Sequence, residues 1–366
     1  MPFTGQGRKK ILVVAEAPGQ EEDKQNTQLI GECGQLLRRH LKSFGVDLDK
    51  DCWKTNAVIC HPHKNRTPTD EMITACRPNL LKTIKELKPN SILLLGRTAV
   101  KSLIDTMWEE KIGDKEGLTK WLGWNIPSQL YNAWLVPNYH PAYLLRNNEP
   151  LLTKFFKQNL LRGIKAAENP PWKQVPDYYK EVEIIYNDAK VSQIISERKR
   201  KGSPAAFDFE TNCIKPNGKD SFIYSCSISW GNRTIAFPWR GEAVTAMKHF
   251  ITSSCPKIAS NLKYEDRWVR CKLETTVGNW DWDAMVAAHV LDNRAGITGL
   301  KFQALVLLGF ASYNTIVKPF LSSSSKSGYS LNRIKDLDLN DLLLYNGLDS
   351  LLEFKVAEKQ KQLLGV

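Results

Sequence analysis

The sequence predicts an α/β protein of two domains, and three observations lead to this prediction. The first is the length, because 366 residues exceed what one ordinary hydrophobic core holds together. The second is an alternation of apolar runs and amphipathic segments before residue 169, which is typical of a three-layer α/β/α unit with a parallel sheet. The third is the proline pair in Asn169–Trp172, after which a new pattern starts. We expect domains at 1–168 and 180–366 and a linker at 169–179.

The N-terminal region contains short apolar runs separated by amphipathic segments. The expected strands are Ile11–Val14, Ser91–Leu95 and Trp134–Pro137. The expected helices are Gly34–Phe44, Thr69–Leu87, Arg97–Ile104 and Leu151–Ala167. Thr69 precedes Asp-Glu and is a typical helix N-cap. Because helices separate the strands along the chain, we expect the strands to be parallel.

The C-terminal region has a different order of elements. The expected strands are Glu181–Tyr186 and then a meander of Ala205–Thr211, Phe222–Trp230 and Arg233–Pro238. A helix is expected over Asp188–Arg200, and the pattern is helical from Asp283 onward. This order predicts a second α/β domain.

The charge of the chain suits a polyanionic partner. Lys and Arg number 51 against 39 Asp and Glu, which gives a net charge of +12. No run of 18 apolar residues occurs, and Met1–Lys10 is polar and basic, so we expect no membrane association and a location in the cytoplasm, or in the host cytoplasm for a phage protein. The eight cysteines form no C-x2-C motif and are expected to be reduced thiols.

Two pairs of oxygen-bearing side chains indicate a metal site. Asp208 and Glu210 are two residues apart on an expected strand, so they share one face while Phe207 and Phe209 take the other. Tyr345 and Asp349 are four residues apart, one turn along a helix. Oxygen-rich sites of this kind bind Mg²⁺ or Mn²⁺. The alternative is that these acids are solvated side chains of an edge strand.

Several segments in this order resemble the DEDD 3′-to-5′ exonucleases, and in particular the proofreading domain of family A DNA polymerases. The segments are Asp208–Thr211, Ala259–Asp266, Asp281–Met285, Gly299–Gly309 and the pair Tyr345 and Asp349. The resemblance implies an RNase H-like α/β fold and phosphodiester hydrolysis with two Mg²⁺ or Mn²⁺ ions ~4 Å apart. It also implies that Asp208 and Asp349 are the main ligands, that Glu210 supports one ion, and that Tyr345 contacts the attacking water.

The second of these motifs departs from the family pattern. Counted from Asn261, the position that usually holds Asp is Glu265, and Asp266 follows one residue later. We favour Glu265 as the ligand, because Asp266 would point about 100° away on a helix. Asp266 remains the alternative.

Residues 10–165 resemble the uracil-DNA glycosylase superfamily, most nearly its iron-sulfur-containing families. Glu16–Gly19 is similar to the first motif, Asn56 to the uracil-reading asparagine and His140–Arg146 to the second motif. The resemblance implies that Asn56 holds a flipped base, that Glu16 activates water or stabilises charge at the sugar, and that His140 donates to the uracil oxygen. Leu29 stands where the family has a stacking aromatic. As alternatives, Asn56 is a turn or strand-end asparagine and His140 a satisfied histidine beside Pro141.

Two cysteines match the family's second cluster-binding pair. Cys60 and Cys76 have its spacing, but Met1–Lys10 contains no cysteine where the first pair is expected. A [4Fe-4S] cluster needs four thiolates. We therefore do not expect a cluster here.

Together these patterns predict a 3′-to-5′ DNA exonuclease of the proofreading or repair type that carries a uracil-DNA glycosylase-like DNA-binding module. The combination resembles the front portion of some phage replicative polymerases. The expected partners are DNA, as single strands or frayed 3′ ends, and a DNA polymerase. One alternative is an active glycosylase coupled to end trimming, and another is a decayed module that binds DNA or docks a partner.

Overall fold

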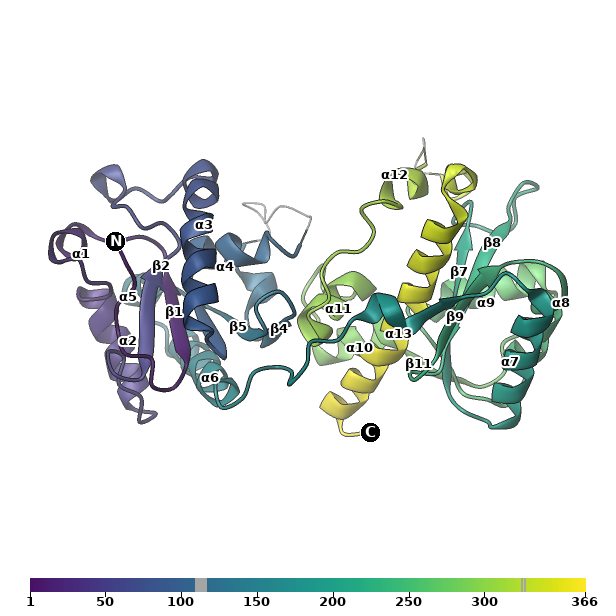
Figure 1. The fold of residues 1–366 in the computed structure, drawn as a ribbon, viewed down its shortest axis with the longest axis horizontal. Coiled ribbons are helices and arrows are strands. Elements are labelled where there is room, and N and C mark those ends of the chain that lie inside the picture. Colours follow the sequence, from purple (N-terminus) through teal and green to yellow (C-terminus); the bar gives the residue numbers. More distant parts are fainter. Residues whose placement is uncertain (109–116, 324, 326) are drawn as a thin grey trace. The chain divides into compact units, whose positions relative to one another are not determined.

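The computed structural model describes residues 1–108, 117–323, 325 and 327–366 (Figure 1). The chain forms two compact units. The N-terminal unit is Met1–Pro176 with Leu305–Ala311, and the C-terminal unit is Asp177–Ala304 with Ser312–Val366. Among the described helices, none has both the length and the apolar character needed to span a membrane.

The N-terminal unit contains a five-stranded sheet in the order β2-β1-β3-β5-β4. The strands are β1 (Ile11–Ala15), β2 (Cys52–Asn56), β3 (Ser91–Leu95), β4 (Ile126–Ser128) and β5 (Ala133–Asn138). β1, β2, β3 and β5 are parallel, whereas β4 is antiparallel to β5. The expected parallel sheet is confirmed for the strands that the sequence predicted, β1, β3 and β5, whereas β4 was not among them. Only four residues join β4 to β5, and so short a connection permits only an antiparallel pair.

Helices cover both faces of this sheet. They are α1 (Gln20–Gln25), α2 (Glu32–Lys42), α3 (Asp70–Leu87), α4 (Arg97–Ile104), α5 (Pro141–Arg146) and α6 (Pro150–Ala166). α2 and α6 share a hydrophobic core with alternate residues of β1 and β3, and α4 contacts these strands as well. The expected three-layer fold is confirmed, and Thr69 caps α3 by accepting a hydrogen bond from the Met72 amide.

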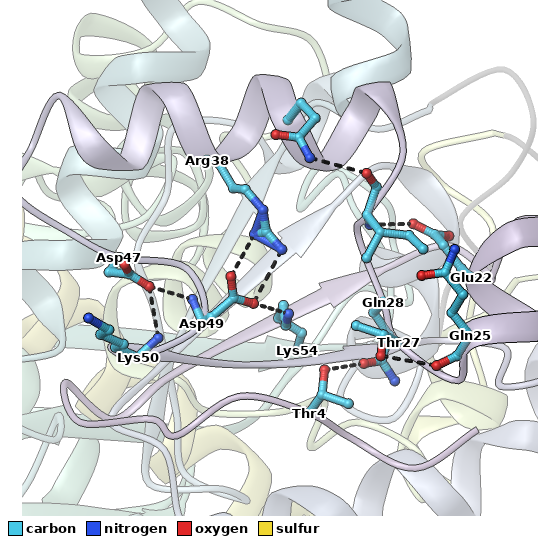
Figure 2. A network of polar contacts seen from close by, with 12 residues as sticks. Thr4, Glu22, Gln25, Thr27, Gln28, Arg38, Asp47, Asp49, Lys50 and Lys54 are labelled. Atoms are coloured by element: carbon cyan, nitrogen blue, oxygen red, sulfur yellow. Dashed lines mark hydrogen bonds and ion pairs between the residues drawn. The ribbon is translucent and has the colours of Figure 1, made fainter.

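β2 was not expected as a strand, because its centre carries a lysine instead of an apolar residue. Lys54 is 1% exposed, and its ammonium group pairs with Asp49. Figure 2 shows that Arg38 of α2 reaches the same carboxylate, with its Nη1 3.1 Å from Asp49 Oδ2. Thr4 forms a β-bridge with Lys54 and donates to Gln28, so the N-terminal segment is fixed to this edge of the sheet by polar contacts.

The C-terminal unit contains a six-stranded sheet in the order β11-β10-β7-β8-β9-β6. The strands are β6 (Val182–Ile184), β7 (Ala205–Thr211), β8 (Ile223–Ser229), β9 (Thr234–Pro238), β10 (Lys257–Ala259) and β11 (Trp280–Asp283). β7, β8 and β9 form the expected antiparallel meander, while β10 is parallel to β7 and to β11. The sheet is mixed, with β7 near its centre.

The helices of this unit are α7 (Asp188–Arg200), α8 (Gly241–Ile251), α9 (Leu262–Lys272), α10 (Ala284–Leu291), α12 (Lys318–Leu321) and α13 (Leu339–Leu364). The first residues of α11 (Leu300–Leu308) also belong to it, whereas the residues from Leu305 onward belong to the N-terminal unit. Short 3-10 helices occur in the chain at His63–Asn65, Thr119–Trp121, Tyr178–Glu181 and Ile334–Asp336. α13 contacts β7, β8 and β9 on one face of the sheet, and α7 and α8 share a core with the opposite face (Figure 1). This arrangement confirms a second α/β domain and fits the expected RNase H-like class.

Candidate active site

β7 delivers two carboxylates to the face of the sheet that α13 covers. Phe207 and Phe209 are buried in the core that contains α7 and α8. Because side chains alternate along a strand, Asp208 and Glu210 lie on the other face. Glu210 is 8% exposed, whereas Asp208 is partly exposed. The two phenylalanines therefore anchor the strand and orient both acids in one direction.

α13 supplies the facing groups. Tyr345, Asp349 and Glu353 follow each other at intervals of four residues, so they form one stripe along the helix. All three are buried, with exposed fractions of 6%, 8% and 2%. The helix is long and begins at Asp338, which accepts hydrogen bonds from the amides of Asn340 and Asp341. A rigid helix thus holds the stripe against β7.

The acids of the two elements form one cluster. Single oxygen atoms of Asp208, Glu210 and Asp349 all lie within 4.8 Å of one another. Burial raises the pKa of Asp208 and Glu210 well above the usual range, and the Asp349 charge raises the pKa of both further. Burial likewise raises the pKa of Asp349. Three carboxyl groups held this close fit a divalent cation, because a cation would offset both their desolvation and their mutual repulsion.

Asn346 holds Asp208 in place. Its Nδ2 donates to Asp208 Oδ2 at 2.7 Å, and its Oδ1 accepts from Ser225 Oγ at 2.9 Å. The amide is fully buried, so β8 fixes its orientation and the amide in turn fixes the carboxylate. The second oxygen of Asp208 is left for a cation.

Lys301 of α11 brings a positive charge to the cluster. Its Nζ donates to the Tyr345 hydroxyl oxygen at 2.9 Å and lies 5.0 Å from the centroid of the Tyr345 ring and 5.6 Å from that of Tyr313. Tyr313 donates a hydrogen bond to Asp349. The Lys301 charge opposes the burial that raises the pKa of Asp349 and Glu210. Burial raises the pKa of Tyr345, so its phenol stays protonated.

α9 separates the two candidates of the second motif. Glu265 is 1% exposed, and its Oε2 has no hydrogen-bond partner. Burial and the Asp208 charge raise its pKa. Asp266 instead accepts a hydrogen bond from Arg270 at 2.6 Å on the surface of the helix. The structure therefore places Glu265 beside the cluster and Asp266 away from it, although Glu265 does not belong to the trio within 4.8 Å.

Sequence reasoning missed two members of this site. Glu353 accepts from the Ser260 amide at 2.9 Å, its Oε2 is buried without a partner, and burial followed by the charges of Asp208 and Glu265 raises its pKa. Its signal was present, because it lies one turn beyond Asp349 in the helical stripe. Lys301 lies in the segment Gly299–Gly309 that resembles the exonucleases, but no role was assigned to it, because α11 and α13 are distant in the chain.

The expected residues of the N-terminal unit lie at the carboxyl ends of three parallel strands, β1, its neighbour β2, and β5, which β3 separates from β1. Glu16 follows β1 and accepts from Thr98 Oγ1 at 2.9 Å. Asn56 ends β2 beside Ala15, is 3% exposed, and has no hydrogen-bond partner for its Nδ2. His140 follows β5 and caps α5 by accepting the Ala142 amide at its Nδ1, 3.2 Å away.

Burial lowers the pKa of His140, and the nearby Glu16 charge opposes this shift. Gly96 allows the close approach of the histidine, because a Cβ at this position would lie 2.9 Å from His140 Cβ and the backbone has φ +87°. Leu29 is 4% exposed and packs in the core with α2. Cys60 is exposed, Cys76 is partly buried, and both are free thiols.

Comparison with known proteins assigns the N-terminal unit to a family. The sequence model of the Uracil DNA glycosylase superfamily matches residues 2–163. The type-4 uracil-DNA glycosylase of Saccharolobus solfataricus is 32% identical over 173 residues, which cover 47% of this chain and 77% of that enzyme. The chain belongs to the uracil DNA glycosylase superfamily. The family match ends at residue 163, within α6 and before the proline-rich segment.

A further relative extends beyond this family region. The DNA polymerase of Bacillus phage SP01 is 25% identical over 335 residues, which cover 80% of this chain and 34% of the polymerase. The chain thus spans about a third of that protein. Among solved structures, the catalytic core of RRP6 from Trypanosoma brucei is similar with 13% identity and a TM-score of 0.38, over 50% of this chain and 46% of that one.

Proposed function

We propose that the C-terminal unit is a metal-dependent 3′-to-5′ DNA exonuclease and that the N-terminal unit binds DNA. The observation that carries this proposal is the convergence of Asp208, Glu210 and Asp349 within 4.8 Å. The similarity to a phage DNA polymerase over most of the chain and the net charge of +12 support it. Single strands and frayed 3′ ends are the substrates we infer, and a DNA polymerase is the partner.

The carboxylates Asp208, Glu210 and Asp349 would hold two Mg²⁺ or Mn²⁺ ions, with Glu265 completing the set. When bound, such ions supply a Lewis acid for the phosphate and a water of lowered pKa. The chain itself supplies positioning. Tyr345 keeps its phenolic proton, which it shares with Asp349 and could donate to the oxygen of a water molecule, while its own oxygen accepts the hydrogen bond of Lys301.

The direction and metal dependence of digestion test this proposal. A single-stranded DNA labelled at its 5′ end is incubated with the protein in Mg²⁺ or in EDTA. We expect a ladder of progressively shorter labelled products in Mg²⁺ only, and protection when the 3′ end is blocked. Immediate release of labelled mononucleotide would show the opposite polarity. Cleavage at internal positions of a strand with a blocked 3′ end would show an endonuclease.

Glycosylase activity is a second candidate, favoured by the unpaired Nδ2 of Asn56. A buried amide without a partner is costly, and a base bound at the ends of β1, β2 and β5 would satisfy it. Glu16 and His140 lie at the same strand ends. Against it, Leu29 stands where the family has an aromatic ring, and ring stacking is worth ~1–3 kcal/mol per base.

Alkali cleavage of a uracil-containing duplex tests this second activity. The assay is best made with Asp208→Ala, so that trimming does not obscure the product. Strand breaks at uracil that disappear in Asn56→Ala would establish a glycosylase. Intact DNA with the Asp208→Ala protein would leave the N-terminal unit as a DNA-binding module.

A further inference from the structure

Two loops lie together directly beside the end of β7. Residues 212–222 connect β7 to β8, and residues 327–333 precede α13. The Lys215 amide donates to Gly328 O at 2.8 Å, and the Asn332 amide donates to Asn212 O at the same distance. Asn332 Nδ2 also donates to Thr211 O at 2.9 Å, one residue after Glu210. The loops are therefore fixed to the strand that carries the carboxylates.

These loops expose two aromatic rings beside two lysines. Phe222 is 56% exposed and Tyr329 is 50% exposed. Lys215 Nζ lies 4.8 Å from the centroid of the Tyr329 ring, and Lys272 Nζ lies 6.0 Å from that of Phe222. We call these four residues the aromatic platform. Exposed apolar side chains that lie together and are rimmed by charged groups are typical of an interaction site.

We propose that the aromatic platform binds single-stranded DNA upstream of the 3′ terminus that enters the carboxylate cluster. The inference rests on the proposed exonuclease function and adds a strand-binding surface to it. Exposed rings stack on unpaired bases, and neighbouring lysines attract the phosphates between them. Bases in a duplex are already stacked on each other and do not offer their faces, so the platform selects a single strand over a duplex.

Binding without chemistry tests the platform. The affinity of the full chain for a labelled single strand about ten nucleotides long is measured in EDTA by fluorescence anisotropy. Phe222→Ala and Tyr329→Ala should each raise Kd about tenfold, the effect of losing one base stack. Tyr186→Ala is the matched control, because Tyr186 is 42% exposed in the same unit but contacts Asn340 instead. It should leave Kd unchanged.

Digestion kinetics in Mg²⁺ provide the second readout. The two platform variants should raise KM on the long strand with kcat unchanged, and a trinucleotide, which is too short to reach the rings, should be cut as by the wild type. Lys272→Glu should also raise KM. This variant tests the platform with both rings in place, so it can be used if an aromatic variant does not fold. Kd and KM that stay within about twofold in all variants would overturn the platform.

The two proposals fail in different ways. Wild-type protein that shows no digestion in Mg²⁺, with Kd still raised in the platform variants, would remove the exonuclease function and keep the strand-binding surface. Normal digestion by the wild type, with Kd and KM unchanged in the platform variants, would keep the exonuclease function and remove the strand-binding surface. A loss of affinity for duplex equal to that for the single strand would refute the selectivity for unpaired bases.

Discussion

Among single residues, Lys301 has two effects on the site: it orients the Tyr345 hydroxyl group, and it affects the pKa of Asp349. The ammonium donates to the phenol oxygen, so the phenolic hydrogen is directed elsewhere. The same charge counteracts the burial that raises the pKa of Asp349. Lys301 is therefore a positioning residue, because it acts on Tyr345 and on the acids.

Replacing Lys301 tests this role. Lys301→Met should lower kcat about 10- to 100-fold, the usual effect of losing a supporting contact in a metal site, and Lys301→Arg should restore part of it. Without the ammonium the pKa of Asp349 rises further, so the acid limb of the pH–rate profile should move to higher pH. The exposed Lys359 of α13 offers a control, and Lys359→Met should change neither quantity. An unshifted profile with normal kcat would exclude the role.

At the scale of elements, the register of α9 determines which acid completes the site. Glu265 lies on the buried side of the helix and Asp266 on its outer side, where it pairs with the exposed Arg270. One step along a helix turns a side chain by about 100°, so only one of the two can face β7.

A pair of neighbouring substitutions tests this assignment. Glu265→Gln should reduce digestion by more than about 100-fold, because the loss of a ligand exceeds the loss of a supporting contact. Asp266→Asn should have less than about a twofold effect, because an exposed ion pair contributes little. Steady-state digestion rates in Mg²⁺ give both numbers. The reverse ranking would make Asp266 the ligand.

Helices and strands with a regular pattern of apolar residues were predictable from the sequence. The contacts between elements that are distant in the chain were not. The alternation of Phe207, Asp208, Phe209 and Glu210 fixed the two faces of β7 in advance. β2 was missed because Lys54 breaks its apolar pattern, and that lysine is buried only through its pairing with Asp49. The position of Lys301 depends on the packing of α11 beside α13, which no local pattern records.

At the scale of the whole C-terminal unit, the ionised carboxylates of the site lower the stability of the metal-free fold, because they are buried close together. Burial raises the pKa of Asp208, Glu210, Asp349, Glu265 and Glu353. Their unfolded pKa values are about 4, so the folded state binds these protons more tightly. These groups therefore contribute most to the free energy of unfolding below about pH 4, and their contribution is lost as the pH rises through their pKa values in the folded state. A divalent cation bound as proposed would replace the protons.

Thermal unfolding tests this linkage. Saturation with Mg²⁺ near 100-fold above Kd should add about 2.7 kcal/mol at neutral pH, which is about 5–10 °C in Tm for a domain of this size. The gain should shrink as the pH falls, because protons then compete with the ion. Asp208→Asn should raise the Tm of the metal-free protein and reduce the gain. A Tm that ignores Mg²⁺ at every pH would contradict the linkage.

The central claim is that Asp208, Glu210 and Asp349 converge to hold divalent cations. Anomalous diffraction from crystals soaked in Mn²⁺ tests it most directly, because the metal is located without any assumption about activity. We expect an anomalous peak within coordination distance of all three carboxylates, and its loss in Asp349→Ala. A map with no peak there, or with peaks only at other sites, would contradict the account.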